Sequence, residues 1–511
     1  MRNLAAMLSK TLCLLLCAGL IGVPPAAGAA DYRIETVAEG LAHPWSLAFL
    51  PDGRMLVTER AGRLRVIEDG VLLESPVEGV PEAYVRGQAG LFEVLPDPDF
   101  EDNRWIYLSL AHGTGRANST RVVRGRLEGM VLREVEVLFT AEPARRTSAH
   151  YGGRMAFLAD GTLVVGLGDG QSYREEAQRL DSHTGTIVRV ARDGSVPPDN
   201  PFVGRDDALP EIYSYGHRNV QGLVFDAEGG VLWAHEHGPR GGDELNRIEP
   251  GENYGWPAAT FGVEYYGARI TPHTSRPGMR DPVLHWTPSI APGGMTLYRG
   301  SQFPAWQGNL LVAALAHRQV RRVMLEGAEL QEQETLFAEI GERLRDIRVG
   351  PDGALYLLTD TPRGRVLRIS ADDRTLGSAK ITDGRSIDDD VQGVVHDDQQ
   401  PGGHPLGRFR RIARLAAFGP AASPRPRPVL QPDDVARQPP AVEQEMGSGD
   451  DEQRGRIPGQ EQKGQGIDRD VRECGQVAAS FLAHHPLALQ EIVADGVRDE
   501  LVGGDHGYSP R

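Results

Sequence analysis

Cysteine is almost absent from this chain, and basic residues and long apolar runs are scarce. The three cysteines among 511 residues are Cys13, Cys17 and Cys474, so the central part has no thiol for disulfides, soft metals or nucleophilic catalysis. The 55 Lys and Arg are outnumbered by 71 Asp and Glu, and a net charge of −16 argues against a nucleic-acid partner. No apolar run beyond the N-terminus approaches the ~20 residues of a membrane span. We therefore expect a soluble protein with an acidic surface.

The N-terminal segment has the pattern of a targeting signal. Arg2 and Lys10 precede an apolar stretch over residues 11–23, and a run of small residues follows at 26–30. This order of charge, apolar core and small residues is typical of a secretory signal peptide, while the apolar stretch is too short for a membrane anchor. We expect cleavage after residue 29 and a periplasmic or secreted product.

Residues 30–370 repeat one theme, a turn of the Asp-Gly kind between two alternating apolar segments. Such a pattern is a strong β-hairpin signal, and no long stretch has the 3.6-residue period of an amphipathic helix. Six copies of roughly 57 residues each fit four-stranded blades with long loops. The sequence predicts an all-β fold, a six-bladed β-propeller, in preference to a β-sandwich or a β-helix. The copies are 45–58, 91–108, 154–167, 221–233, 295–312 and 345–358.

The character of the chain changes after residue 370. Strand patterning stops, and residues 371–511 are rich in Asp, Gln, Arg, Gly and Pro, with no Trp. This composition predicts a low-complexity, disordered tail, and the abrupt change also resembles out-of-frame translation. A frameshift there could damage the strand that closes the propeller ring. We assign the tail no function.

Three segments carry residue types suited to catalysis or anion binding. His150 precedes Gly-Gly and a strand, where an imidazole could act as general base or could simply make the ordinary hydrogen bonds of a turn. Arg218 and Asn219 also precede a strand and suit carboxylate or quinone oxygens. Arg343 and Arg345 share a face if the strand alternates regularly. That pair indicates either an anionic ligand or an exposed strand with salt bridges.

A fourth segment, residues 235–246, combines histidines with a glycine-rich loop. His235 and His237 would share a face of a strand and could contribute to a zinc site, but the sequence nominates no third ligand. The Gly-Pro-Arg-Gly-Gly loop at 238–242 offers backbone carbonyls, and Glu244 offers a carboxylate. These hard oxygen donors favour Ca²⁺ over zinc.

These segments together resemble the soluble aldose sugar dehydrogenases of the glucose/sorbosone dehydrogenase family, which depend on pyrroloquinoline quinone (PQQ). The resemblance spans roughly residues 41–369 and excludes the tail. The motifs that carry it are HPWSLAFLPDG at 43–53, GQAGL at 87–91, HYGGR at 150–154, YGHRN at 215–219, EHGPRGGDELN at 236–246, NYGWP at 253–257 and RLRD at 343–346.

The resemblance implies that aldoses are oxidised at C1 to lactones on a six-bladed propeller that binds PQQ over Ca²⁺. His150 would take the proton of the C1 hydroxyl while hydride passes to the quinone. Arg218 would lie at the reacting centre, Gln88 and Asn219 would line the cofactor, and Tyr265 would flank its ring. The electron acceptor and the oligomeric state stay open.

The resemblance also implies two Ca²⁺ sites. The backbone carbonyls of Gly238 and Pro239 would ligate the catalytic ion, and Glu244 and Tyr254 would belong to a second, structural site. Two other functions stay open, a Ca²⁺-dependent lactonase and a non-catalytic propeller that binds glycans or proteins.

The family resemblance assigns Arg343 and Arg345 to the carboxylates of PQQ. Concentrated arginines in a chain of net charge −16 agree with a ligand that carries three carboxylates. Some members have a lysine near the cofactor where this chain has Ala316. His317 or Arg318 could supply the missing positive charge, or one contact to PQQ could be lost.

Overall fold

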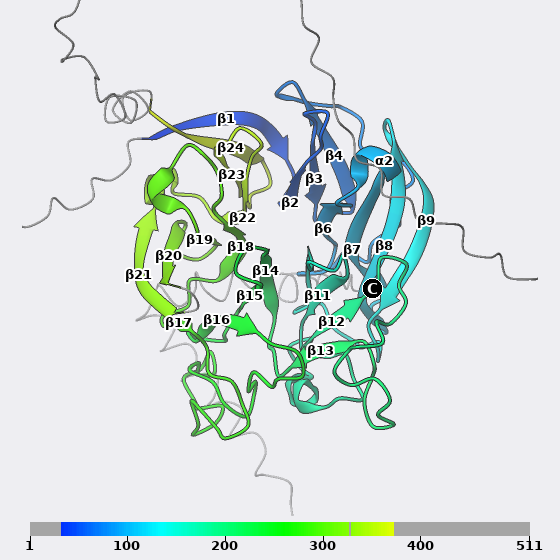
Figure 1. Cartoon of the computed structure of the whole chain (residues 1–511), viewed down its shortest axis with the longest axis vertical. Coiled ribbons are helices and arrows are strands. Elements are labelled where there is room, and N and C mark those ends of the chain that lie inside the picture. The colour runs from blue at the N-terminus through cyan, green and yellow to red at the C-terminus, as the bar shows by residue number, and fades with distance from the viewer. Residues whose placement is uncertain (1–31, 327–328, 373–511) are drawn as a thin grey trace, which may run out of the picture. The chain divides into compact units, whose positions relative to one another are not determined.

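The computed structural model describes residues 32–326 and 329–372, which form six four-stranded antiparallel sheets around a central axis (Figure 1). The predicted all-β, six-bladed propeller is confirmed. The first three blades are β2 (Pro44–Phe49), β3 (Met55–Glu59), β4 (Arg63–Glu68) and β5 (Val71–Leu72); β6 (Leu91–Pro96), β7 (Trp105–Gly113), β8 (Asn118–Glu128) and β9 (Val131–Thr140); and β10 (Gly152–Phe157), β11 (Leu163–Leu167), β12 (Thr186–Val190) and β13 (Ile212–Tyr215).

The other three blades repeat this order and the last one uses the first strand of the chain. They are β14 (Val220–Asp226), β15 (Val231–Glu236), β16 (Asp243–Ile248) and β17 (Leu284–Trp286); β18 (Pro292–Leu297), β19 (Leu310–Ala314), β20 (Val320–Glu326) and β21 (Glu329–Leu336); and β22 (Leu344–Val349), β23 (Leu355–Thr359), β24 (Gly364–Ala371) and β1 (Tyr32–Leu41). The six predicted hairpins are the first two strands of the six blades. The predicted signal peptide and tail lie outside the described residues.

Helices are few and short in the described part of the chain. They are α2 (Phe100–Asn103) and the 3-10 helices η1 (Arg174–Gln178), η2 (Pro304–Trp306) and η3 (Ala338–Ile340). Among the described residues, no helix has the length and apolar character needed to cross a membrane.

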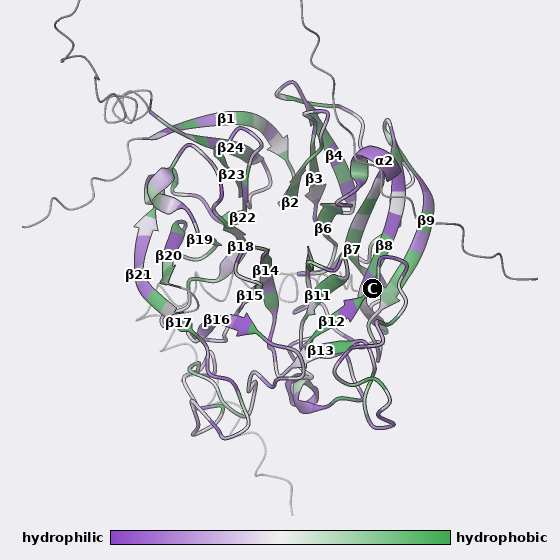
Figure 2. Cartoon of the chain, viewed as in Figure 1, coloured by the Kyte–Doolittle hydropathy of each residue, from purple (hydrophilic) through white to green (hydrophobic). Residues whose placement is uncertain are grey.

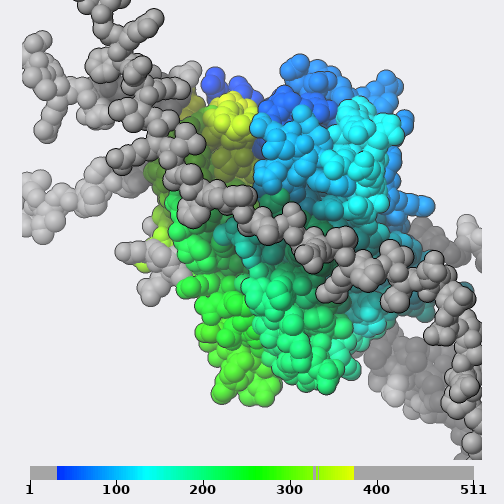
Figure 3. All heavy atoms as spheres, turned by 45° about the vertical axis from the view of Figure 1, so that its right-hand side comes forward, coloured from blue at the N-terminus to red at the C-terminus, as the bar shows by residue number. Residues whose placement is uncertain are grey.

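The ring closes between the two ends of the described chain. β1 pairs with β24 from Tyr32 opposite Ala371 to Leu41 opposite Gly364, and Figure 3 shows the yellow end of the described chain against its blue start. Both closing strands lie within the described residues and end by Ala371. The expectation that a frameshift could damage the closing strand is therefore wrong for this chain.

Apolar side chains from neighbouring blades pack against each other. Leu56 and Leu64 of the first blade and Ile106 and Leu108 of the second are fully buried in one such cluster. The outermost strand β9, by contrast, mixes hydrophilic and hydrophobic residues and is largely exposed (Figure 2). Burial of apolar area between blades is the main stabilising contribution in such a fold.

Each innermost strand has an irregular register near its beginning, where it pairs with the second strand of its blade. A β-bulge turns the local backbone and re-aims its side chains. Because the irregularity recurs at the same end of every blade, it shapes one face of the ring. The shifts fall between Pro44 and Ser46, Leu91 and Val94, Gly152 and Met155, Val220 and Gly222, Pro292 and Met295, and Leu344 and Asp346.

Candidate active site

Two positions in each blade meet at that face, the residues before the innermost strand and the residues after the second strand. In an antiparallel hairpin the start of one strand lies beside the end of the next, as Gly152 does beside Leu167. Gln88, His150, Arg218 and Arg343 all occupy the first position. The fold therefore brings these separated motifs to one face.

His150 is held by a buried carboxylate that the sequence did not single out. Its side chain is 5% exposed, and Nδ1 lies 2.7 Å from Oδ1 of Asp169, which follows β11. The His150 backbone N–H donates to Oε1 of Gln88 at 2.9 Å. His150 also has a φ of 53°, a left-handed conformation that is uncommon for residues other than glycine and is found at functional sites.

Asp169 is completely buried and accepts hydrogen bonds on both oxygens. The backbone N–H of Gln171 donates to Oδ1 at 2.7 Å, and Trp256 Nε1 donates to Oδ2 at 2.8 Å. Burial favours the protonated carboxyl, but His150 and then Arg218 outweigh it and lower the pKa of Asp169. An ionised Asp169 accepts from Nδ1 of His150, so Nδ1 carries the ring proton and Nε2 is the basic nitrogen of the neutral ring.

Arg218 and Asn219 lie next to this pair. The Arg218 guanidinium stacks over Trp256 at 5.4 Å from the ring centroid. The backbone carbonyl of Arg218 accepts a hydrogen bond from the backbone N–H of Asp169 at 2.8 Å. Asn219 Oδ1 accepts from the N–H of Gly152 at 3.1 Å. These contacts join the loops before β10 and β14 into one unit.

Arg343 and Arg345 reach the same carboxylate, although not for the predicted reason. Arg343 precedes β22 and Arg345 lies at the bulge, so regular strand alternation does not relate them. Nε of Arg343 is 3.9 Å and Nη2 of Arg345 is 2.7 Å from Oδ2 of Asp360, the residue after β23. His43 Nδ1 lies 2.9 Å from the other oxygen of Asp360. Arg345 Nη1 also donates to Oε1 of Gln221 at 3.5 Å.

The carboxylate of Asp360 is surrounded by Arg343, Arg345 and His43. Burial opposes its ionisation, but Arg345, the hydrogen bond from His43, and Arg343 lower the pKa of the Asp360 carboxyl far below its ordinary value. Gln221 Nε2 donates to Asn219 Oδ1 at 3.3 Å. The arginines are thereby linked through Gln221 to the loops that hold His150.

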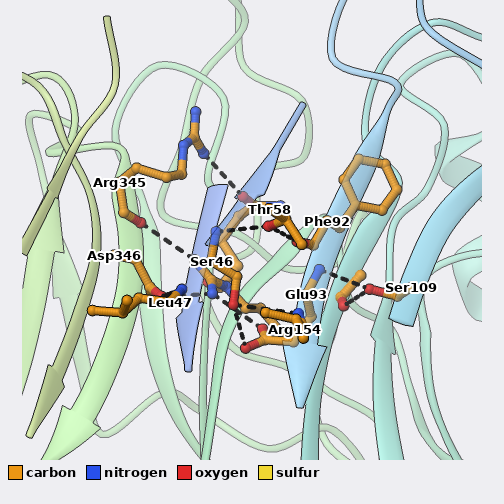
Figure 4. A network of polar contacts seen from close by, with 12 residues as sticks. Ser46, Leu47, Thr58, Phe92, Glu93, Ser109, Arg154, Arg345 and Asp346 are labelled. Carbon is orange, nitrogen blue, oxygen red and sulfur yellow. Dashed lines mark hydrogen bonds and ion pairs between the residues drawn. The ribbon is translucent and has the colours of Figure 1, made fainter. Parts of the chain in front are cut away.

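A buried network of four charges lies beside these arginines (Figure 4). Glu93 and Asp346 each contact both Arg154 and Arg348, and Arg154 Nη1 is 3.1 Å from an oxygen of each carboxylate. Arg154 also donates from Nη2 to the carbonyl of Arg345 at 3.3 Å. We call Glu93, Arg154, Asp346 and Arg348 the four-charge network. It ties β6, β10 and β22 together.

The loop after β15 gathers carbonyl oxygens at one point, as a cation site requires. Nη1 of Arg218 donates to the carbonyls of His237 at 3.0 Å and Gly238 at 2.6 Å. Asp243 holds this loop by accepting from the Gly238 N–H at 2.8 Å. Pro239 is buried beside them. Hard oxygen donors of this kind fit Ca²⁺.

Glu244 lies in a second oxygen-rich cluster. Its Oε2 accepts from Asn246 Nδ2 at 3.4 Å, and the same amide donates to Glu236 Oε1 at 3.3 Å. Burial and the nearby Glu236 raise the pKa of Glu244 well above its ordinary value. Oδ1 of Asn246 is buried without a hydrogen bond. Two close carboxylates and an unsatisfied amide oxygen fit a bound cation.

His217 connects Tyr254 with this cluster. The ring of His217 stacks on the Tyr254 ring with 4.8 Å between the centroids, and its Nδ1 is 2.9 Å from Glu236 Oε1. The Tyr254 hydroxyl is engaged elsewhere, because it donates to the Arg247 carbonyl at 2.6 Å and accepts from the Glu249 N–H at 2.8 Å.

The structure gives no support to a zinc site at the two histidines. His235 lies within β15, and both of its ring nitrogens are buried without a hydrogen bond. His237 lies beyond the end of the strand, and its Nε2 is 2.8 Å from the Pro292 carbonyl. In residues 32–326 and 329–372, no three His, Cys, Asp or Glu side chains cluster as a zinc site would need. Tyr265 is 42% exposed on the loop before β17.

Three residues at the site escaped sequence reasoning, Asp169, Asp360 and Trp256. The two aspartates follow the second strands of their blades, as His237 does, and that shared position is the signal that could have identified them. Trp256 belongs to the NYGWP motif, but only the fold shows that it contacts Asp169.

Comparisons with known proteins identify the family of the chain. The family model described as Glucose / Sorbosone dehydrogenase matches residues 41–368. The aldose sugar dehydrogenase YliI of Escherichia coli is 40% identical over 350 residues, covering 67% of this chain and 94% of that protein. The crystal structure of the soluble E. coli aldose sugar dehydrogenase in its apo-form has a TM-score of 0.65 at 39% identity, covering 67% of this chain and 100% of that one.

A third similar structure is the PQQ-bound form of aldose sugar dehydrogenase from Streptomyces coelicolor. Its TM-score is 0.56 at 29% identity, and the match covers 67% of this chain and 99% of that one. The extent of the family match and these identities are consistent with the motifs and the propeller. The chain belongs to the glucose/sorbosone dehydrogenase family.

Proposed function

We propose that this chain is a PQQ-dependent aldose sugar dehydrogenase that oxidises aldoses at C1 to lactones, with Ca²⁺ as a second cofactor. The observation that carries the proposal is the buried contact of 2.7 Å between His150 and Asp169, within a network that reaches the arginines around Asp360. A base and an anion-binding cluster on one face are what this reaction needs.

His150 acts as the base in this proposal. Because Asp169 fixes the proton on Nδ1, Nε2 takes the proton of the C1 hydroxyl. As the hydroxyl loses its proton, the hydrogen on C1 leaves as hydride with the electron pair of the C1–H bond. The oxygen on C1 then forms the carbonyl of the lactone. PQQ held by Arg343 and Arg345 would supply the acceptor for that hydride, and Ca²⁺ held by the carbonyls of Gly238 and Pro239 would supply a Lewis acid beside it. Proton removal by a positioned base contributes roughly 10²–10⁴-fold to such a rate.

The other residues bind and orient. Arg343 and Arg345 hold carboxylates of PQQ, since guanidinium–carboxylate pairs are strong and directional. Arg218 lies at the reacting centre, held over Trp256. Gln88 and Asn219 line the cofactor, and Tyr265 flanks its ring.

Ca²⁺ at the reacting centre is held by the carbonyls of Gly238 and Pro239. The convergence of neighbouring carbonyls on the Arg218 guanidinium supports a preference for positive charge at this point. A second Ca²⁺ uses Glu244, which lies buried beside the carboxylate of Glu236, with Asn246 donating to both. Tyr254 is the other ligand that we propose for this ion, and its ring stacks on His217, which contacts Glu236.

Export and domain boundaries complete the proposal. Residues 1–29 act as a signal peptide, residues 30–370 are the propeller domain, and the mature enzyme works in the periplasm or outside the cell. We assign residues 371–511 no function.

The lactonase reading is not favoured. A Ca²⁺-dependent lactonase would need carboxylates that face the metal and no cluster of arginines beside it. The arginines around Asp360 have no role in that chemistry.

Dye-linked oxidation of a panel of aldoses tests the proposal. We expect activity only when PQQ and Ca²⁺ are both supplied, and a loss of roughly 10²–10⁴-fold in kcat for His150→Ala. His150→Ala should still bind PQQ, because the arginines are intact. His273→Ala, which alters an exposed histidine, is the control and should keep full activity. A folded protein that binds PQQ with no loss in His150→Ala would contradict the role of the base.

A further inference from the structure

Arg60 lies between the arginines around Asp360 and the loop that carries Gln88. It directly follows β3, and its backbone N–H donates to the carbonyl of His43 at 3.1 Å. The His43 ring in turn contacts Asp360. On the other side, the Arg60 carbonyl accepts from the N–H of Leu91 at 3.1 Å, three residues after Gln88.

The stem of Arg60 is fixed by close packing against the Gln88 loop. A Cβ at Gly90 would lie 2.0 Å from the carbonyl oxygen of Arg60 and 2.8 Å from the Cγ atom of Arg60. Only glycine at position 90 therefore allows the Gln88 loop to approach Arg60 so closely. The position of Arg60 is therefore set by the backbone of two neighbouring blades. Its long side chain starts from the same face of the ring as Arg343 and Arg345.

Arg60 is a partly buried cation that the chain does not neutralise. In the part of the chain that the structure describes, its guanidinium has no ion pair and no hydrogen bond. Burial lowers the pKa of Arg60, Asp360 opposes this effect, and the like charge of Arg345 adds to it. Arg60, Arg343 and Arg345 thus share one carboxylate, Asp360, in a chain whose net charge is −16.

An excess of guanidinium groups in a partly buried place is unfavourable unless an anion binds there. The proposed cofactor carries three carboxylates, and each guanidinium can bind one of them through two parallel hydrogen bonds. Arg318 is less suited to this role, because it is exposed and donates to the carbonyl of Gly341 at 3.1 Å. Ala316 has no charge to offer.

We propose that Arg60 binds a carboxylate of PQQ and is the third guanidinium of its binding site, beside Arg343 and Arg345. The inference rests on the proposed function and adds a ligand-binding residue to the same site. It also assigns the positive charge that Ala316 does not supply.

Calorimetric titration of PQQ into the cofactor-free protein with Ca²⁺ present tests the assignment. Loss of one charge-assisted hydrogen-bonded pair should weaken binding by roughly 10- to 100-fold in Arg60→Gln. Arg205→Gln is the matched control, because it removes the same charge from an exposed pair with Asp207 and should leave the Kd unchanged. The unfolding midpoint of each variant shows whether it is folded.

The trimethyl ester of PQQ separates carboxylate recognition from shape. Arg60→Gln and the unaltered protein should bind the ester with equal affinity, because the ester offers no charge to Arg60. If Arg60→Gln does not fold, Arg60→Lys replaces it in the test. Lysine keeps the positive charge and the aliphatic chain but cannot form two parallel hydrogen bonds to a carboxylate, so it should weaken PQQ binding by a smaller factor than the one expected for Arg60→Gln.

The outcomes separate this assignment from the proposed function. If the unaltered protein binds PQQ and a folded Arg60 variant binds it within twofold, the assignment of Arg60 is wrong while the proposed function stands. Failure of the unaltered protein to bind PQQ would overturn the proposed function, and the assignment of Arg60 with it.

Discussion

Two groups of charged residues near the axis of the propeller differ in how their charges balance. In the four-charge network, Glu93 and Asp346 neutralise Arg154 and Arg348, and all four are joined by ion pairs. In what we call the arginine cluster, Arg60, Arg343 and Arg345 lie around the carboxylate of Asp360.

This difference separates a structural role from a binding role. A neutral, fully paired network needs no ligand, and its carboxylates are 0–1% exposed. Burial opposes the charge of Arg348, yet Asp346 and Glu93 raise its pKa above the ordinary value, so the network stays ionised. A cluster with excess positive charge is stabilised when an anion binds to it. Asp360 and Gln221 contact Arg345 and so fix its guanidinium in position for such an anion.

Arg154→Met should have the largest effect, because Arg154 belongs to the network and also contacts the cluster. The substitution leaves two buried carboxylates with one arginine between them, which costs about 3–5 kcal/mol in the free energy of unfolding. It also removes the hydrogen bond to the Arg345 carbonyl, so PQQ binding should weaken too. Denaturant unfolding and calorimetric titration measure the two effects.

Arg299→Met is the matched control for that experiment. Arg299 is 38% exposed and pairs with Asp226 at 3.0 Å, and removal of an exposed pair costs at most about 1 kcal/mol. A loss of stability in Arg154→Met no larger than that of Arg299→Met would show that the network has no structural role.

Asp360→Asn should have a smaller effect that depends on pH. The folded state lowers the pKa of Asp360, so its ionised form stabilises the fold at every pH above the unfolded value of about 3.9. The difference in unfolding free energy between the two proteins should be constant from pH 7 to 5. Below about pH 4 it should shrink by at most about 1.4 kcal/mol per pH unit, because the unfolded chain then binds a proton. Urea unfolding at several pH values measures it, and a difference that grows in acid would contradict the sign.

The fold could be predicted from local pattern alone. An Asp-Gly turn such as Asp52-Gly53, between apolar strands, specifies a hairpin without knowledge of the rest of the chain, and Gly53 has the positive φ of 89° that such a turn needs. Six such hairpins predict six blades. The motifs that precede the inner strands likewise predict His150, Arg218 and Asn219 as candidate site residues.

The partners of those residues could not be predicted, because they depend on which strand ends meet. Asp169 and Asp360 follow second strands and carry no motif of their own, yet each contacts a residue identified from sequence. The bulge at Arg345 breaks the alternation on which the prediction of a shared face relied. The common contact with Asp360 comes from the loop and the bulge together, which sequence periodicity does not reveal.

The most direct test compares one variant from each group, Arg345→Gln and Arg348→Met, by measuring PQQ affinity and unfolding free energy for both. Arg348 is suitable because it contacts Glu93 and Asp346. We expect Arg345→Gln to lose roughly 10- to 100-fold in PQQ affinity with little loss of stability. We expect Arg348→Met to lose about 3–5 kcal/mol of stability and to bind PQQ as the unaltered protein does. Equal losses of affinity in the two variants would contradict the division between a binding cluster and a structural network.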